Sequence, residues 1–153
     1  MNKAFSPQAA HSKIPPGPRD YFVYAVTSAS LAPAAVANLV LAISADSDFW
    51  WTGLTCFTAN ANASQNYSTR LLPLMTLQIT DTGSGRQLFN VPVPVPAVAG
   101  DGAHVYRLIH PRFFARNATI QVQLTNFDAA VTYVNTYLAF IGFKIFGLNR
   151  RSA

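Results

Sequence analysis

Residues 119–146 read TIQVQLTNFDAAVTYVNTYLAFIGFKIF, which is the strongest structural signal in the chain. The first part of this run alternates between polar side chains and the apolar Ile120, Val122 and Leu124. A period of two is typical of a β-strand with one buried and one exposed face. Residues 131–146 continue as a longer run of β-branched and aromatic side chains, which favours a second strand. Joined by the short turn NFDAA, the two runs predict a β-hairpin that buries a large apolar surface.

Similar patterns upstream predict that most of the chain is β-structure. Glutamate is absent and lysine is rare, so two favoured helix formers contribute little. The sequence DTGSGR at residues 81–86 is typical of a turn between antiparallel strands. Residues 110–117 are expected to form the turn that leads into the final hairpin. The strands that we expect before the hairpin lie at residues 21–27, 36–43, 49–58, 71–80, 87–91 and 105–109.

Some connections between these strands are too long for a simple meander. Pro92, Pro94 and Pro96 remove every second backbone N–H of their segment, so it cannot pair as a central strand and is expected to be a long crossing loop. Crossing loops favour Greek-key or jelly-roll connectivity. The sequence therefore predicts an all-β fold, a single-domain jelly-roll or Greek-key β-sandwich of about eight antiparallel strands.

The length of 153 residues suits one domain with a substantial core. Residues 1–18 contain several prolines and little that can pack, so we expect an extended N-terminal arm that becomes ordered against a neighbour. The sandwich is assigned to residues 19–147, and a short basic tail to residues 148–153. The arm residues that we expect to contact an adjacent subunit are Ile14, Pro15 and Pro16.

Charge and hydropathy argue against several classes of protein. The formal net charge of +5 comes mostly from scattered arginines that form no basic stripe, so we expect no specific binding to nucleic acid. The most apolar stretch, residues 31–43, is shorter than the roughly 20 residues of a membrane-spanning helix. Residues 1–13 lack the apolar centre of a signal peptide. We therefore expect a soluble protein without membrane association that is made in the cytoplasm. Cys56 is the single cysteine, which excludes a disulfide within the chain.

No pattern of residues predicts catalysis or metal binding. Asp46 and Asp48 lie in a short polar turn, and we interpret them as groups that bind nearby backbone, because a cation loop supplies more oxygen ligands. His104 and His110 have no third type of ligand close by in the sequence. The Gly-x-Ser-x-Gly pattern of a nucleophile elbow is absent. We expect no catalytic residue, no metal and no cofactor.

Arginines and tryptophans beside apolar residues are the candidate contact residues. Arg86 and Arg112 each lie in a predicted turn next to large apolar side chains, and Phe113 follows Arg112 directly. Such an arginine either braces its turn by pairing with an aspartate or a carbonyl, or anchors an interface, where arginine and aromatic residues are enriched. Trp50 and Trp51 are adjacent on one predicted strand and must face opposite sides of the sheet. One tryptophan enters the core, and the other is exposed, covered by a loop or buried by a partner.

Four segments in a fixed order give the chain a resemblance to a known class of protein. They read DSDFWW at residues 46–51, TDTGSGRQLF at residues 80–89, LIHPRFFARNATI at residues 108–120 and FIGFKIF at residues 140–146. Together they resemble small virion structural proteins that are encoded near the major capsid gene of tailed bacteriophages. The similarity spans roughly residues 21–146.

This resemblance implies a jelly-roll domain that decorates or cements the capsid shell as a homo-oligomer. The implied partners are the major capsid protein and neighbouring copies of the chain, and the implied location is the capsid surface of the virion. The resemblance identifies no individual contact residue. Two alternatives stay open: a structural protein of the neck, tail or spike base, and a carbohydrate-binding jelly roll in which Trp50 or Trp51 stacks on a sugar. An enzyme is the class that the residues favour least.

Overall fold

The computed structural model describes residues 17–61, 71–101 and 103–147, which are almost entirely β-structure. The predicted contact residues Ile14, Pro15 and Pro16, and the tail at residues 148–153, lie outside the described residues. The elements in chain order are β1 (Arg19–Leu31), β2 (Val36–Ala42), β3 (Asp48–Asn60), β4 (Met75–Asp81), β5 (Arg86–Gln87), β6 (Val93–Pro94), α1 (Val95–Val98), β7 (Tyr106–Phe114), β8 (Thr119–Asn126) and β9 (Tyr133–Ile145). The predicted all-β fold is confirmed.

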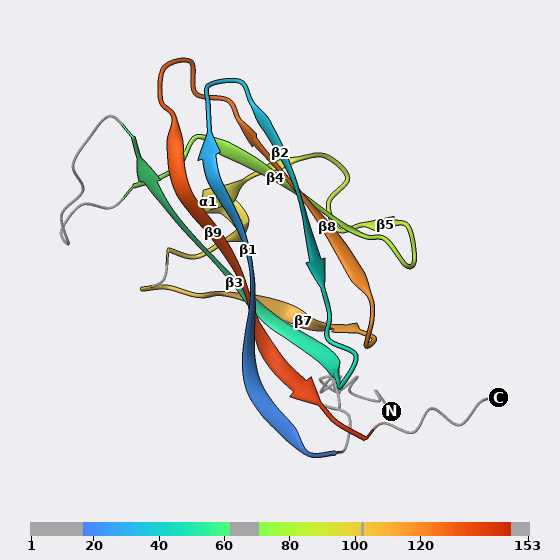
Figure 1. The fold of residues 1–153 in the computed structure, drawn as a ribbon. Coiled ribbons are helices and arrows are strands. Elements are labelled where there is room, and N and C mark those ends of the chain that lie inside the picture. The colour runs from blue at the N-terminus through green and yellow to red at the C-terminus, as the bar shows by residue number, and fades with distance from the viewer. Residues whose placement is uncertain (1–16, 62–70, 102, 148–153) are drawn as a thin grey trace, which may run out of the picture.

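The strands form two antiparallel sheets that face each other (Figure 1). Sheet A has the order β1-β9-β3-β7, and sheet B has the order β2-β8-β4-β5, with β6 also paired to β4. From β1 to β4, and again from β6 to β9, each successive strand lies in the opposite sheet. This repeated crossing is jelly-roll connectivity, as the sequence predicts. Within the described ranges, the only helix is the four-residue α1, and no helix is long and apolar enough to cross a membrane.

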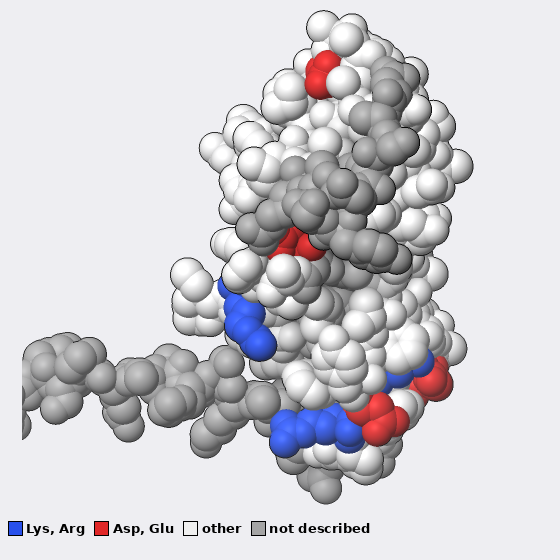
Figure 2. Space-filling model, turned by 90° about the vertical axis from the view of Figure 1, so that its left-hand side faces the viewer, with Lys and Arg blue, Asp and Glu red and all other residues white. Residues whose placement is uncertain are grey.

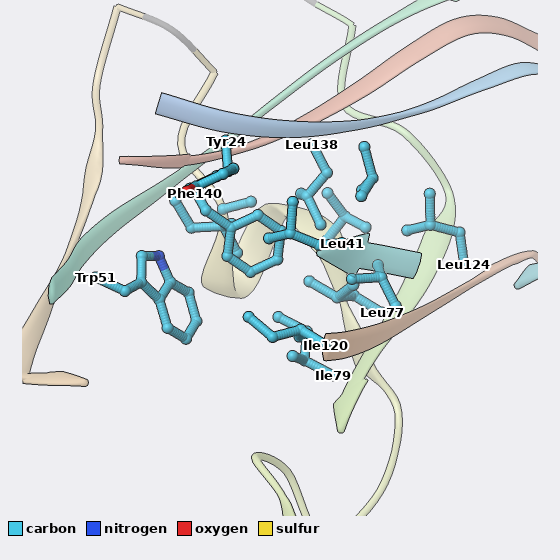
Figure 3. Close-up of a cluster of buried hydrophobic side chains, with 14 of the residues drawn as sticks. Tyr24, Leu41, Trp51, Leu77, Ile79, Ile120, Leu124, Leu138 and Phe140 are labelled. Atoms are coloured by element: carbon cyan, nitrogen blue, oxygen red, sulfur yellow. The ribbon is translucent and has the colours of Figure 1, made fainter. Parts of the chain in front are cut away.

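The core lies between the two sheets and consists of their inward-facing side chains (Figure 3). In β8, Ile120, Val122 and Leu124 are fully buried, as their alternation predicts. Trp51 of β3 and Phe140 of β9 contribute large side chains from sheet A, and their ring centroids lie 5.1 Å apart. Fully burying such a side chain contributes about 1.5–3 kcal/mol. The inner layer is therefore the main source of stability.

The predicted C-terminal hairpin is wrong, because β8 lies in sheet B and β9 in sheet A. The chain turns the corner at Asn126, which is fully buried. Its side-chain amide donates hydrogen bonds to the carbonyl oxygens of Leu31, Ala32 and Val131 at 3.1, 3.0 and 2.8 Å. These bonds connect the β8–β9 corner to the β1–β2 turn, and the two corners together hold one end of the sandwich. The alternation predicted both strands correctly and their mutual pairing incorrectly.

Two further segments differ from the sequence-based expectation. The predicted turn at residues 110–117 is mostly strand, because β7 continues to Phe114. The register between β3 and β7 shifts between the pair Trp51–Arg112 and the pair Gly53–Arg107. As a result, β7 has extra residues at this point that have no partner in β3. The proline-rich crossing loop contains the short β6, which pairs with β4 through Val93 and Pro94. Val93 keeps its N–H between two prolines, so pairing is possible at this edge of sheet B.

Candidate functional site

Four aromatic side chains cross the outer face of sheet A in a single row. Tyr21 of β1 is in register with Phe143 of β9, Phe143 with Trp50 of β3, and Trp50 with Phe113 of β7. The rings of Tyr21 and Phe143 meet edge to face at 6.1 Å, and those of Trp50 and Phe113 at 6.2 Å. We call these four residues the aromatic row. It spans every strand of the sheet.

The aromatic row is accessible to solvent at both ends. Tyr21 is 64% exposed and Phe113 is 37% exposed, while Phe143 and Trp50 between them are half-buried. A second aromatic pair on the same face, Phe57 and Tyr137, lies farther along the strands and is also exposed. Val23 of β1 and Ile141 of β9 pair with each other and add apolar side chains to this face. The outer face of sheet A therefore carries several exposed aromatic and apolar side chains.

The two adjacent tryptophans face opposite sides of sheet A, as the alternation predicts. Trp51 is only 1% exposed, stacks on Phe114 and donates its indole N–H to the Gly53 carbonyl oxygen at 2.6 Å. Trp51 is thus a core residue and not a contact residue of the folded chain. Trp50 faces outward in the aromatic row, and its indole N–H is buried with no hydrogen-bond acceptor in the described part of the chain. A buried unpaired donor costs about 1–3 kcal/mol.

Three predicted contact residues lie together at the end of the aromatic row that Phe113 forms. Arg86, Arg112 and Phe113 line a hollow of about 200 Å³ between the β4–β5 turn and β7, whose other lining residues are Asp81, Ser84 and Phe114. Both arginines are exposed. The Asp81 carboxylate instead accepts hydrogen bonds from the Gly83 N–H at 3.0 Å and the Ser84 hydroxyl at 2.7 Å. Among the described residues, no ion pair joins Arg86 or Arg112 to a carboxylate, so a bracing ion pair is not observed.

The outer face of sheet B carries amide and hydroxyl groups instead. Asn38 of β2, Gln123 of β8 and Gln78 of β4 are in register, and Gln121, Thr80 and Gln87 follow in the next row. We call these six residues the amide face. The Gln123 amide donates to the Asn38 side-chain oxygen at 3.0 Å. A hollow of about 170 Å³ lies over this surface and is lined by Gln78, Thr80, Gln87, Gln121 and Gln123.

The carboxylates of Asp46, in the β2–β3 turn, and of Asp48, the first residue of β3, make structural contacts. Asp46 accepts from the Lys144 ammonium at 3.2 Å, and this hydrogen bond, together with one from Ser47, lowers the pKa of Asp46. Asp48 accepts from the Arg116 N–H at 2.8 Å. The described ranges contain no cluster of three or more histidine, cysteine, aspartate or glutamate side chains that fits a metal ion. Burial raises the pKa of the Cys56 thiol to about 12, so the thiol stays protonated at neutral pH.

Charged side chains are few on the side of the molecule that Figure 2 shows. They lie as small separate groups near the two ends and near the middle of this side. Sequence reasoning identified Trp50, Arg86, Arg112 and Phe113, but it missed Tyr21, Phe143 and the amide face. The outward positions of each strand were readable from alternation. Which strands lie side by side was not, and this pairing creates both surfaces.

Comparison with known proteins gives no match, whether to a family model, to a curated protein or to a solved structure. Fold and surface therefore define the class by themselves. The chain is an antiparallel jelly-roll sandwich with one aromatic and one amide-rich outer face.

Proposed function

We propose that the protein is a non-enzymatic structural protein of a bacteriophage virion, which binds the assembled capsid shell and stabilises it as a decoration or cement protein. The observation that carries this proposal is the aromatic row on the outer face of sheet A. The resemblance of the sequence to small phage virion proteins supplies the type of partner. The row then supplies the surface by which the chain binds the major capsid protein and neighbouring copies of itself.

The energetics of the aromatic row suit a contact centre. An aromatic side chain can bury 150–250 Å², and tryptophan, tyrosine and arginine dominate the binding energy of known interfaces. Tyr21 and Phe113 retain exposed area that a partner would cover. Arg86 and Arg112 lie beside Phe113, where each guanidinium can donate to carbonyls or carboxylates of a partner.

The start of the sandwich lies at the same end of sheet A as the aromatic row. Pro18 accepts a hydrogen bond from the Phe146 N–H at 3.0 Å, and Arg19 pairs with Ile145 two positions before Tyr21 reaches Phe143. An arm formed by the preceding residues, including Ile14, Pro15 and Pro16, would leave the domain close to the docking surface. The arm is therefore proposed to extend the contact onto an adjacent subunit.

Binding of many copies to the shell stabilises it by mass action, because the chain adds binding free energy to the assembled state only. The proposal can be tested with particles of the phage whose genome encodes the chain, prepared without it. The full chain should co-sediment with these particles and raise the temperature at which they release DNA. Trp50→Ala and Phe113→Ala should each weaken binding at least tenfold, since an interface centre loses about 2 kcal/mol or more on truncation.

The matched control is Val40→Ala, which removes an exposed apolar side chain from the outer side of sheet B. This variant should bind as the unchanged chain does. Equal binding by all three variants would contradict docking through the aromatic row. The position of the chain within the particle distinguishes shell decoration from the remaining alternative, a structural role at the neck, tail or spike base. Copies spread over the shell support decoration, whereas a single ring of copies at the neck, tail or spike base would contradict it.

A further inference from the structure

The amide face differs from an ordinary solvent-exposed sheet surface because one of its amides is deeply buried. Gln78 is only 9% exposed although it points outward from β4. Its amide nitrogen donates to the Phe89 carbonyl oxygen at 2.9 Å. Because a carbonyl can only accept, the nitrogen must occupy that side and the amide orientation is fixed. The Gln78 side-chain oxygen is buried and has no hydrogen-bond partner within the described ranges.

This unpaired acceptor belongs to a side chain that lines the hollow over β4, β5 and β8. Around it stand the amides of Gln87, Gln121 and Gln123 and the hydroxyl of Thr80. Gln121 and Gln87 are exposed, so their donors and acceptors are available to a ligand. The hollow has a volume of about 170 Å³ and is lined by N–H donors, carbonyl acceptors and a hydroxyl.

The chemistry of the hollow selects for a neutral ligand. No lining residue is ionisable, so a phosphate or carboxylate group would find no countercharge there. A sugar hydroxyl both donates and accepts, which matches a side-chain amide on each count. Val36 and Val40 flank the amide rows on β2 and are exposed, which provides apolar contact for the C–H groups of a sugar ring.

We propose that the amide face is a binding site for a neutral glycan, and that the Gln78 side chain moves on binding so that its buried oxygen can accept a hydrogen bond from a sugar hydroxyl. Neither tryptophan takes part, since Trp51 lies in the core and Trp50 lies on the opposite sheet. The amide rows themselves contain no aromatic ring for stacking, so the affinity of one site is expected to be weak, with a Kd on the order of 1 mM. This inference does not depend on the proposed docking of sheet A.

The test is a titration of the isotopically labelled full chain with neutral oligosaccharides of glucose, mannose and N-acetylglucosamine, followed by NMR. At least one of them should shift the side-chain amide signals of Gln78, Gln87, Gln121 and Gln123 in a saturable manner. Gln121→Ala, at an exposed position, should retain the fold and weaken binding about tenfold. Tyr21→Ala, on the opposite sheet, should leave the affinity unchanged.

Gln78→Met separates the acceptor from the shape of the side chain, because methionine has a similar length and lacks the amide. Loss of binding in this variant, with the fold retained, supports the assigned role. Should it fail to fold, Gln121→Ala still decides the question. The proposal is overturned if none of the oligosaccharides shifts these signals at concentrations well above the millimolar range. Shifts confined to sheet A, or shifts of the amide signals with an anionic polysaccharide alone, would overturn it as well.

Discussion

The aromatic row crosses the outside of sheet A, whereas the outward positions of β4 and β8 in sheet B carry glutamine and threonine. The inner sides of both sheets are alike, because they share one apolar core. The core does not determine which side chains point outward from either sheet. Contact with water alone favours polar side chains, which the outward positions of β4 and β8 carry. The aromatic row on sheet A is the basis of our proposal that this face meets another macromolecule. The difference between the two faces therefore carries the functional information.

The largest effect is expected from the two adjacent tryptophans, which separate the inside of sheet A from its outside. Trp51→Ala removes a buried ring and should lower the free energy of unfolding by about 3–5 kcal/mol. Trp50→Ala removes a half-buried ring and should cost about 1–2 kcal/mol, while abolishing most of the binding to particles. Urea denaturation measures both losses. Equal losses for the two variants would contradict the assignment of Trp51 to the core and Trp50 to the outer face.

A smaller loss is expected at the corner that places β8 and β9 in different sheets, since this corner keeps the two faces apart. Asn126→Ala removes the buried amide that donates to the carbonyl oxygens of Leu31, Ala32 and Val131 and should cost about 2–3 kcal/mol. Asn38→Ala, an exposed asparagine on the amide face, is the matched control and should change stability by less than about 0.5 kcal/mol. Thermal or urea unfolding that gave the same result for both would show that the corner bonds contribute nothing.

The smallest effect is expected at acidic pH. There, protonation of aspartates in the loops should lower the stability without changing the two outer faces. Hydrogen bonds from the Ala130 and Val131 N–H groups lower the pKa of Asp128, and the Lys144 ammonium lowers that of Asp46, both from 3.8. A folded pKa below the unfolded one gives stability that is present above pH 3.8 and is lost as the pH falls through the folded value. The melting temperature should thus be flat near neutrality and fall in acid. Asp128→Asn should show a shallower fall, and an equally steep one would argue against this linkage.

Most of the correct predictions came from the alternation of polar and apolar side chains along single strands. It identified the buried side of β8 and the separation of Trp50 from Trp51, because a period of two depends only on local geometry. The pairing of β8 with β9 was wrong, because the choice between a hairpin and a sheet crossing rests on bonds from Asn126 to residues far away in the sequence. The aromatic row was invisible for the same reason. Its members come from four strands, and only the register places them together.

The hollow beside β7 shows both the reach and the limit of sequence reasoning. Arg86 was singled out in one predicted turn, and Arg112 with its neighbour Phe113 in another, and the fold places all three around one hollow. No local pattern relates the β4–β5 turn to β7. Likewise, Gln78 looks like any polar residue on the wet side of a strand. Only its bond to Phe89 and its burial distinguish it from the other glutamines.

The central claim is that sheet A faces the capsid shell. Its most direct test is the orientation of the chain in a cryo-electron microscopy map of the phage particle. The account predicts that β1, β9, β3 and β7 lie against capsid subunits, with Trp50 and Phe113 covered and the amide face turned toward solvent. A map in which sheet B lies against the shell, or in which the chain is missing from the particle, would contradict it.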